Sequence, residues 1–514
     1  MSVRSERSNS FNVLWLIVLH LAIVLPLAYF LNIWTDEAST LYSTQHGFLN
    51  AFQHAATDEK QAPLYFWIMS LWRLLNDSIF FARLFAVIVS CVSIAFFARL
   101  ARRMFEPPAA WRTTAFFAFH PFLVWASVEI RVYASVILLS ILLMTFFQKG
   151  FFEDPDAETG SRRKSQIIFL LISIVALYTN YYLGFLLVGM FAALVATRQW
   201  RAARDYTLVM LVVGLTFVPQ LFTIKSQFLT NTSGYREPTS LAEGLRTVWH
   251  HVVTFLLPTG ILRDGDGSAI QVIRAWIVRL ALVALVILSV IFRQKLSRRT
   301  VATGATAATI GGTLFAAYFL VGLEYIQIRH ASVLFVPLIL VAASIISDLS
   351  QRDESRDRNN YLIPIAGVVV FLAFSYGNVT LYPNMTKRGD WARVGEFIQQ
   401  NESSGQPIVV FPTFDAIALP YHYIGVNEIL PKDKFFAFEQ EAAFGTENSL
   451  KQQIDFVTSR IPPAADSIWL VEHEQCMTTD ACRPLENFVK ANYTIEKEQE
   501  FYLEKVFLLK KKPQ

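Results

Sequence analysis

Two adjacent carboxylates follow the first long apolar run of the chain, in a position where chemistry is plausible. The run ends at Leu31, and "NIWTDEAST" at 32–40 then places Asp36 and Glu37 a few residues beyond it. Charged groups at a membrane edge are costly unless they have a function, and carboxylates are common general bases. The two acids would also suit the first turn of a surface helix with Thr35 as its cap. The local sequence leaves both interpretations open.

A second polar cluster lies in "HPFLVWASVEIRVYAS" at 120–135, where a short turn joins two apolar runs. Helical spacing puts Glu129 and Tyr133 one turn apart on one face, whereas Arg131 points elsewhere. Three polar groups in so short a turn are costly near lipid unless they line a cavity. A local salt bridge, or an Arg whose charge reaches the lipid headgroups, is the alternative.

Two further stretches carry polar groups at the starts of apolar helices. "EYIQIRHASVLFVP" at 324–337 begins a span with Arg329 and His330. This basic pair would bind lipid headgroups or the phosphate of a lipid-linked substrate, for which a planar guanidinium is well suited. "KQAPLYFW" at 60–67 opens a short helix at its proline, and Tyr65 there is either a substrate contact or an anchor in the membrane interface.

The elements that must position these groups are membrane helices. The chain has 514 residues, of which 54% are hydrophobic and 17% charged. A soluble protein of this length would have a lower apolar fraction. Between bursts of charge lie apolar runs of about 16–22 residues, enough to cross roughly 30 Å of hydrocarbon. The expected spans are roughly 11–31, 79–100, 111–127, 132–148, 165–180, 182–198, 205–222, 271–292, 301–321, 331–347 and 361–381.

The basic bursts between these runs decide the orientation, because Lys and Arg are retained on the cytoplasmic side. The segment 63–76 is apolar but would be only about 21 Å long as a helix. If it crossed the membrane, all later basic bursts would lie outside. We therefore expect it to lie in the interface. This predicts about 11 transmembrane helices, juxtamembrane helices in the first outer loop, a cytoplasmic N-terminus and an outer C-terminus.

The residues after the last expected span form a polar region. Short β-rich runs, "PIVVFP", "SIWLVEH" and "EKVFLL", alternate there with helix-like segments, which is typical of a small α/β domain. We expect two domains, a transmembrane domain at 1–385 and an extracytoplasmic α/β domain at 386–514. Cys476 and Cys482 in "CMTTDAC" would form a disulfide in an oxidising compartment or remain free thiols.

The order of these motifs resembles that of the GT-C glycosyltransferases, and most closely their protein-mannosyltransferase-like branch, which includes bacterial enzymes that use polyprenyl-phosphate-linked sugars. The likeness rests on a "DE" pair after the first span, a "PLY" element opening a juxtamembrane helix, an "EIRVYA" turn and a late span start at "RH". Many relatives have "PPLY" where this chain has "APLY". The "WWD" signature of oligosaccharyltransferases is absent, which disfavours transfer of a preassembled glycan. The resemblance implies an α-helical polytopic GT-C fold with 1–385 as its catalytic domain.

The resemblance also implies an activity, the inverting transfer of a single sugar from a polyprenyl-phosphate donor to an envelope acceptor. The acceptor would be lipid A or lipopolysaccharide, a glycan or a protein, on the outer face of the inner (plasma) membrane. By resemblance, Asp36 is the base and Glu37 a second acid in the same site. Glu129 would orient the acceptor or share a metal. A divalent cation is compatible with such carboxylates and a lipid phosphate, and the sequence leaves the metal open.

The remaining candidates would contact the substrates. Arg131, Arg329 and His330 are the candidates for the donor phosphate, which needs a positive environment as it departs. Tyr65 and Tyr133 complete the expected substrate-binding set.

Two other classes of function are compatible with the sequence. A lipid-linked sugar transporter or flippase would carry ionisable residues near the middle of its spans and often shows paired broken helices. Here the charges gather at one membrane face, and the two halves of the chain do not look alike. A binding or assembly protein would recruit partners through 386–514 without any covalent transfer.

Overall fold

The chain forms two compact units, each built from several stretches of sequence. Unit 1 comprises Met1–Ala28, Phe80–Phe222 and Glu237–Leu381, and unit 2 comprises Tyr29–Ile79, Thr223–Arg236 and Tyr382–Gln514. The structure is a computed structural model. It describes all residues except 1, 46, 58, 153–158, 233–239, 257–275, 277–278, 281–282, 285, 288–289, 292, 322–327, 351–361, 433–446, 475, 477–481 and 514.

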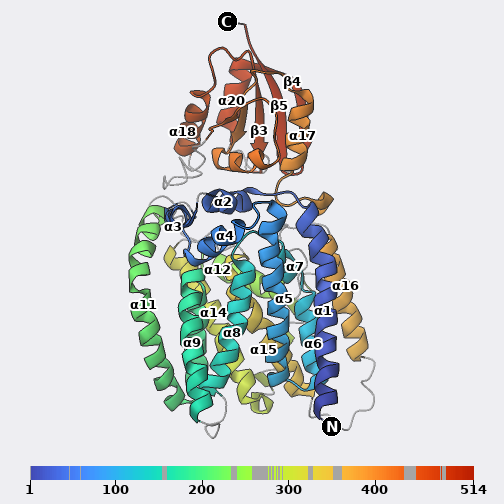
Figure 1. The fold of residues 1–514 in the computed structure, drawn as a ribbon, viewed down its shortest axis with the longest axis vertical. Helices are drawn as coiled ribbons and strands as arrows, with labels where there is room; N and C mark the ends of the chain where they lie inside the picture. Colours follow the sequence, from blue (N-terminus) through green and yellow to red (C-terminus); the bar gives the residue numbers. More distant parts are fainter. Residues whose placement is uncertain are drawn as a thin grey trace. The chain divides into compact units, whose positions relative to one another are not determined.

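Unit 1 is a bundle of helices (Figure 1). Apolar runs in lipid must satisfy their own backbone polar groups, and a helix does this within one segment. The helices are α1 (Ser2–Phe30), α5 (Ile79–Met104), α6 (Pro107–Ala118), α7 (Pro121–Ser127), α8 (Tyr133–Phe147), η1 (Gln148–Phe152), α9 (Thr159–Thr179), α10 (Leu183–Ala196), α11 (Trp200–Thr232), α12 (Leu241–Leu256), η2 (Arg293–Lys295), α14 (Arg298–Val321), η3 (His330–Leu334), α15 (Phe335–Ser350) and α16 (Leu362–Val379).

The helices coincide closely with the expected spans. Outside 271–292, which lies mostly beyond the described residues, each expected span corresponds to one helix or to two consecutive shorter ones. By length and hydropathy, five of the described helices are able to cross a membrane: Val13–Phe30, Ile79–Met104, Tyr133–Phe152, Trp200–Lys225 and His330–Leu349. The chain is therefore a multi-pass membrane protein, and the expected number of spans stays a prediction.

The expected span 111–127 is broken into two helices, α6 and α7, at His120 and Pro121. Pro121 has no backbone N–H to donate, and its ring is incompatible with a continuous helix. The imidazole of His120 accepts a hydrogen bond from Phe122 N at 3.0 Å and caps α7. Its other ring nitrogen bonds to Phe255 O at 3.1 Å. The buried His120 therefore satisfies the backbone groups that the break exposes.

The closest helix packing in unit 1 joins α10 and α14. Gly189 lies where the two backbones approach, and a Cβ on this residue would come within 2.8 Å of Thr306 O. The Thr306 hydroxyl also donates to Gly189 O, at 3.3 Å. Small residues allow such close approach between membrane helices.

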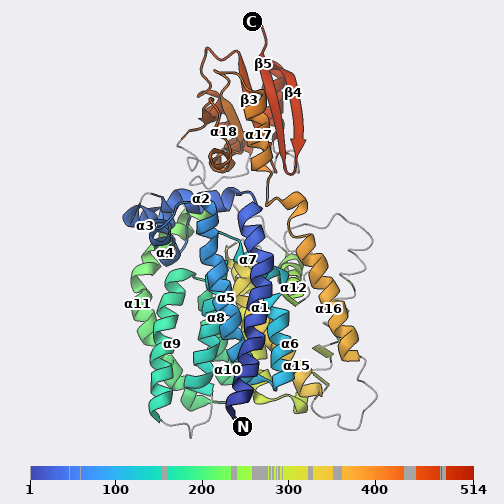
Figure 2. The same ribbon diagram turned by 45° about the vertical axis from the view of Figure 1, so that its right-hand side comes forward.

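Three short helices of unit 2 follow the first expected span: α2 (Thr35–Thr44), α3 (Phe48–Thr57) and α4 (Leu64–Arg73). They pack together, as Figure 2 illustrates. Phe48 stacks on Trp67 with ring centroids 4.5 Å apart, and Arg73 donates to Thr44 Oγ1 at 2.7 Å. At about 15 Å, α4 is too short to cross the membrane. The helix thus lies within the expected segment 63–76 and is as short as expected, and its place in the membrane interface stays a prediction.

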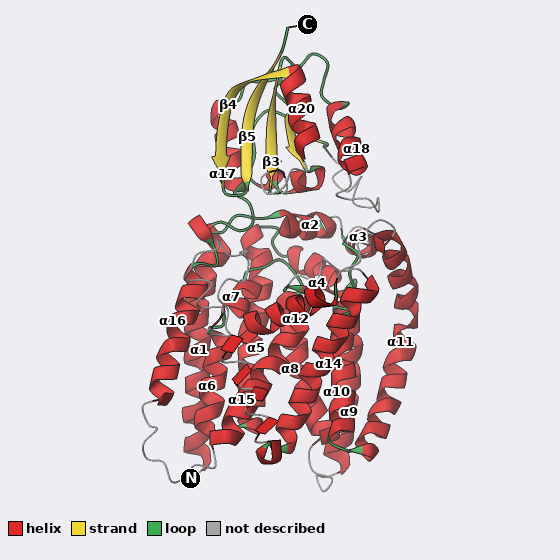
Figure 3. Ribbon diagram, turned by 180° about the vertical axis from the view of Figure 1, so that it is seen from behind, coloured by secondary structure: helices red, strands yellow, loops and turns green. Residues whose placement is uncertain are grey.

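The rest of unit 2 contains a five-stranded sheet in the order β2-β1-β3-β5-β4. β1 pairs in parallel with β2 and β3, whereas β5 is antiparallel to β3 and β4. α17 packs on one face, and α18 and α20 cover the other, as the view in Figure 3 indicates. The elements are α17 (Trp391–Asn401), β1 (Ile408–Phe411), η6 (Thr413–Ile417), η7 (Leu419–Tyr421), β2 (Ile429–Leu430), α18 (Glu447–Thr458), β3 (Ser467–His473), α20 (Arg483–Asn492), β4 (Tyr493–Phe501) and β5 (Glu504–Lys511).

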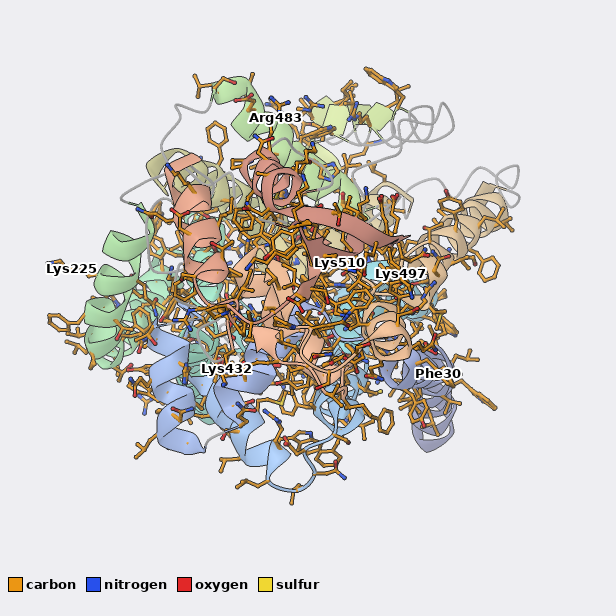
Figure 4. The ribbon with its side chains drawn as sticks, turned by 90° about the horizontal axis from the view of Figure 1, so that it is seen from above. Phe30, Lys225, Lys432, Arg483, Lys497 and Lys510 are labelled. Carbon is orange, nitrogen blue, oxygen red and sulfur yellow. A yellow bond between two sulfur atoms is a disulfide. The ribbon has the colours of Figure 1, made fainter. Side chains whose placement is uncertain are left out.

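The edge strand β4 was not expected from the sequence, because most of its nine residues are exposed and four of them are charged. Its side chains pair with β5 instead of forming a core: Lys505 Nζ lies 2.6 Å from Glu498 Oε1, and Lys510 Nζ lies 3.4 Å from Glu496 Oε1. Lys497 and Lys510 are labelled in Figure 4. Charges of this kind protect an open sheet edge against pairing with other chains.

The two cysteines of "CMTTDAC" lie on the face of the sheet that α18 and α20 cover. Cys476 and Cys482 form a disulfide with their Cα atoms 5.0 Å apart. Cys482 is buried in the core cluster beside Leu485 and Tyr493. The structure therefore resolves the choice between a disulfide and free thiols in favour of the disulfide.

The division into compact units differs from the expected one in two stretches of the chain. The boundary at 381/382 lies close to the expected 385/386, but residues 29–79 and 223–236 group with the C-terminal part and not with the helical bundle. For 29–79 the reason is packing, because η6 contacts α2 directly. The hydropathy pattern could not reveal this contact, because it joins segments that are far apart in the chain.

We predict that Gly189→Ala destabilises the bundle, because the new methyl group would overlap the backbone of Thr306. Overpacking of this kind costs about 1–3 kcal/mol. Thermal unfolding of the detergent-solubilised protein should occur at a lower temperature. Gly214→Ala on α11 is the matched control, since a Cβ there meets nothing within 4 Å. Equal melting temperatures for both variants would contradict the packing argument.

Candidate active site

The helix α2 begins at Thr35, and Asp36 and Glu37 occupy its first turn. Acids in this position interact favourably with the partial positive charge of the helix N-terminus. The expectation that Thr35 caps the helix is wrong, because Trp34 occupies the cap position and its side chain makes no capping hydrogen bond. The hydroxyl of Thr35 instead donates to Asp415 Oδ1 at 2.8 Å. A half-buried carboxylate from the sheet region competes successfully for this donor.

Asp36 and Glu37 lie in different surroundings. The Glu37 side chain is fully buried, and its Oε1 lies 2.6 Å from Nζ of Lys387, which is itself 2% exposed. Asp36 is only partly buried. Successive residues of a helix point about 100° apart, so the two carboxylates face different directions. Asp36 is therefore the carboxylate of the pair that a substrate can approach, whereas Glu37 is neutralised by Lys387.

The loop before α2 is held by the segment that leads into α17. Asn32 Oδ1 accepts from Lys387 N at 2.6 Å, and Asn32 Nδ2 donates to Gly389 O. Ile33 N donates to His422 Nε2 at 3.1 Å. Gly389 has a φ of +96°, and a Cβ there would overlap a neighbouring carboxylate. Glycine is needed at this position both for its backbone conformation and for the close approach.

Behind this contact lies a group of charged side chains, the half-buried Asp415 and the buried His473 and Glu504. His473 Nδ1 lies 3.2 Å from Glu504 Oε1. Burial opposes the charged form of His473, but Asp415, Glu504 and Glu474 outweigh it and raise the pKa of His473 to about 8. Burial raises the pKa of Asp415 and of Glu504, and His473 opposes both shifts. The imidazolium thus stabilises the carboxylate to which Thr35 donates.

A cation faces the same region. Arg388 donates through Nε and Nη2 to the two carboxylate oxygens of Glu474, at 2.6 and 2.7 Å. Burial disfavours the charged guanidinium, but Glu474, Asp36 and Asp415 outweigh it and raise the pKa of Arg388. Its charge therefore acts on the Asp36 carboxylate as well as on its direct partner.

The expected contact residue Tyr65 lies on α4 and is buried. It packs edge-on against Phe66, with ring centroids 5.6 Å apart. The loop before α4 is tied to α2 by Glu59, whose Oε1 accepts from the hydroxyls of Ser39 at 2.6 Å and Ser43 at 3.3 Å. Asp36, Glu37 and Tyr65 thus belong to one packed region of unit 2.

The other expected residues lie in unit 1. Glu129 and Arg131 occupy the turn between α7 and α8, and both are buried. The expectation that Glu129 shares a helix face with Tyr133 is wrong, because α8 begins only at Tyr133. The turn contains the β-branched Ile130 and Val132, which are poor helix formers. The buried charges of Glu129 and Arg131 distinguish this turn from an ordinary loop, because buried charges need polar partners.

Tyr133, Arg329 and His330 come together around Tyr182, a residue that the motifs did not indicate. The ring of Tyr182 stacks on His330 with centroids 5.9 Å apart. The Tyr182 phenol interacts electrostatically with both Tyr133 and Arg329. Tyr133 in turn stacks on Trp125 at 4.8 Å. Tyr182 precedes α10 in a turn, and the sequence offers no helical or charge pattern that would have singled it out.

Part of this arrangement lies in a region that matches a known protein family. Residues 60–222 match the family model described as dolichyl-phosphate-mannose-protein mannosyltransferase. These residues include the "PLY" helix and the "EIRVYA" turn. The chain is a GT-C glycosyltransferase.

The glycosyltransferase is also similar to solved structures. The oligosaccharyltransferase of Archaeoglobus fulgidus in its apo form matches with a TM-score of 0.51 at 10% identity, over 92% of this chain and 70% of that one. ArnT from Cupriavidus metallidurans matches with a TM-score of 0.45 in the apo state at 13% identity, over 98% of both chains. Its complex with undecaprenyl phosphate has a TM-score of 0.46 at 12% identity, over 96% of this chain and 97% of that one.

No curated protein sequence matches the glycosyltransferase significantly.

The metal question can be addressed only for the part of the chain that the structure describes. Within that part, no three His, Cys, Asp or Glu side chains are grouped so that they could hold a metal ion.

Sequence reasoning missed the residues that surround α2 in unit 2. Lys387, Arg388, Asp415 and His473 all come from the polar C-terminal region, which the topology assigned to a separate domain. The one local signal was "TKRGDW", in which two basic residues and a glycine directly follow the last span.

We predict that the stability of unit 2 falls as the pH rises through about 8. His473 has a raised pKa, so the protonated imidazole stabilises the fold fully below its ordinary value of 6.5, and this contribution is lost above about 8. The change should be on the order of 1–2 kcal/mol. Thermal unfolding between pH 6 and 9 measures it. His473→Gln should flatten the profile, whereas His54→Gln on α3, outside this charged group, should not; an unchanged slope in His473→Gln would exclude His473 as the titrating group.

Proposed function

We propose that this membrane glycosyltransferase moves a single sugar from a polyprenyl-phosphate donor to a hydroxyl group of an envelope acceptor, with inversion at the anomeric carbon. The observation that carries the proposal is the placement of Asp36. It is the accessible carboxylate of the "DE" pair, held in the first turn of α2 between two residues whose side chains are both anchored. A fixed direction and an ionised state are what a general base requires.

In the proposed reaction, Asp36 accepts the proton of the acceptor hydroxyl while the oxygen attacks the anomeric carbon. The new carbon–oxygen bond forms as the bond from that carbon to the phosphate oxygen breaks, and the polyprenyl phosphate leaves with the bonding electrons. Displacement from the face opposite the leaving group inverts the configuration. Glu37 does not share the proton in this scheme, because Lys387 holds its charge.

The departing phosphate needs positive charge and hydrogen-bond donors. Arg131, Arg329 and His330 of unit 1 remain our candidates, and Tyr182 joins them because it stacks on His330 and interacts with Arg329. Glu129 and Tyr133 are proposed to orient the substrates. Tyr65 is assigned to the acceptor side because it belongs to the same packed region as Asp36.

The choice of donor is supported by the matched family, whose name specifies dolichyl-phosphate-mannose as donor and proteins as acceptors. The present proposal keeps the donor class, a sugar linked to a polyprenyl phosphate, and does not specify which sugar is transferred. The disulfide between Cys476 and Cys482 supports an oxidising compartment for the C-terminal part, hence the outer face of the inner membrane. Lipid A, lipopolysaccharide, a glycan and a protein are all acceptors that such a location offers.

A transporter or flippase for lipid-linked sugars remains the second candidate for comparison. It would have to use buried charges within the bundle, and Glu129 and Arg131 are such charges. Accumulation of a lipid-linked sugar on one side of proteoliposomes without release of polyprenyl phosphate would favour it.

We predict that Asp36→Asn lowers sugar transfer by about 10²–10⁴-fold, the usual contribution of a general base. The purified enzyme is reconstituted with a panel of polyprenyl-phosphate-linked sugars and envelope extracts, and the release of polyprenyl phosphate is measured. Asp455→Asn, an exposed aspartate on α18, is the matched control and should retain full activity. Undiminished transfer by folded Asp36→Asn would refute the assignment of the base.

We predict that Arg329→Met weakens donor binding, because the planar cation that pairs with the phosphate is lost. The donor KM should rise about tenfold or more, which corresponds to the 1.5–3 kcal/mol typical of a charged hydrogen bond. Steady-state kinetics at varied donor concentration measure the effect. Arg201→Met removes an exposed arginine of α11 and should leave KM unchanged. A normal KM in Arg329→Met would transfer the phosphate role to another residue.

A further inference from the structure

The two side chains that flank Asp36 in sequence are both bound by residues that come after the last span. Thr35 donates to Asp415 Oδ1 at 2.8 Å, and Glu37 lies 2.6 Å from Lys387 Nζ. Asp36 itself is left on the more accessible side of the turn. The position of the proposed base thus depends on two contacts that no motif around Asp36 encodes.

The contact between Glu37 and Lys387 differs from the exposed ion pairs of unit 2. Both side chains are almost completely buried, at 0% and 2% exposure, whereas Lys432 and Glu428 are 68% and 45% exposed. Removing two charges from water costs about as much as their attraction returns, so a buried pair contributes little net stability. What it does provide is a defined geometry, and removal of one partner leaves an uncompensated charge.

The same segment is also attached through its backbone. Lys387 N donates to Asn32 Oδ1 at 2.6 Å, and Gly389 O accepts from Asn32 Nδ2. Lys387 therefore holds the start of α2 twice, by its main chain before the helix and by its side chain within the first turn. Such double attachment restricts both the translation of the turn and its rotation about the helix axis.

We propose that Lys387 is a positioning residue for the transfer reaction, which directs Asp36 and offsets the charge of Glu37 through the buried ion pair. This inference rests on the proposed role of Asp36 as the base. Without Lys387, the Glu37 carboxylate would lose the buried cation that lies 2.6 Å from it, beside Asp36 in the same turn. Two adjacent negative charges disfavour each other, so Asp36 would ionise less readily and its direction would be less restricted.

The experiment compares Lys387→Met, Lys387→Arg and the double variant Glu37→Gln/Lys387→Met in the reconstituted full-length enzyme. Lys387→Met should lower kcat on the order of 10²-fold, the typical effect of a misplaced catalytic group, with a smaller effect on the donor KM. The acid limb of its pH–rate profile should move to higher pH, because Asp36 must be ionised to act. Lys387→Arg should recover much of the activity, and the double variant should return the acid limb to its original pH.

The control is Lys432→Met, which removes a lysine of the same unit from an exposed ion pair (Lys432 is labelled in Figure 4). Its kcat and pH profile should equal those of the unchanged enzyme. A merely structural role for Lys387 would lower the melting temperature and the yield without moving the acid limb, and that result would overturn the proposal, as would normal kcat in folded Lys387→Met.

The two hypotheses can fail separately. If Asp36→Asn abolishes transfer while Lys387→Met is normal, the base stands and the positioning role is refuted. If Asp36→Asn transfers normally, the proposed base itself fails, whatever the behaviour of the Lys387 variants.

Discussion

The ion pair between Glu37 and Lys387 is the interaction on which the arrangement around Asp36 depends. It joins the first turn of α2 to the short segment that leads from the last expected span into the sheet region. Both charges are out of contact with water, so the pair tolerates neither the loss of a partner nor a change in distance without a large penalty. The proposed general base, Asp36, lies at the start of a ten-residue helix and gains from this pair a support that the helix alone does not supply.

A second set of contacts around the start of α2 is also polar. Thr35 binds Asp415, whose charge is balanced by His473, and His473 contacts Glu504. Thr35, His473 and Glu504 are buried and Asp415 is half-buried, and each is acceptable there only because the next one compensates it. The consequence is a chain of mutually dependent charges that reaches from α2 to strands β3 and β5. Apolar side chains at these positions could pack as well, but they would not accept the hydrogen bond from the hydroxyl of Thr35.

The candidate residues around Tyr182 are held by different interactions, because they lie within the helical bundle. Exposure of polar groups to lipid is costly there, and aromatic rings make many of the contacts between these residues. Tyr182 stacks on His330, and Tyr133 stacks on Trp125. The rings fix the orientation of the polar groups without adding charge. The match of 60–222 to a mannosyltransferase family model covers the turn that begins this group.

Hydropathy determined most of the helices, since an apolar run of sufficient length satisfies its own backbone wherever the rest of the chain lies. Alternation of β-rich and helical runs likewise indicated β1, β3, β5, α17 and α20. Local sequence also singled out Asp36, but it could not separate its role from that of Glu37. That difference depends on Lys387 and Asp415, which approach α2 from positions far along the chain. Burial and partner choice are properties of packing between distant segments, and only the tertiary structure decides them.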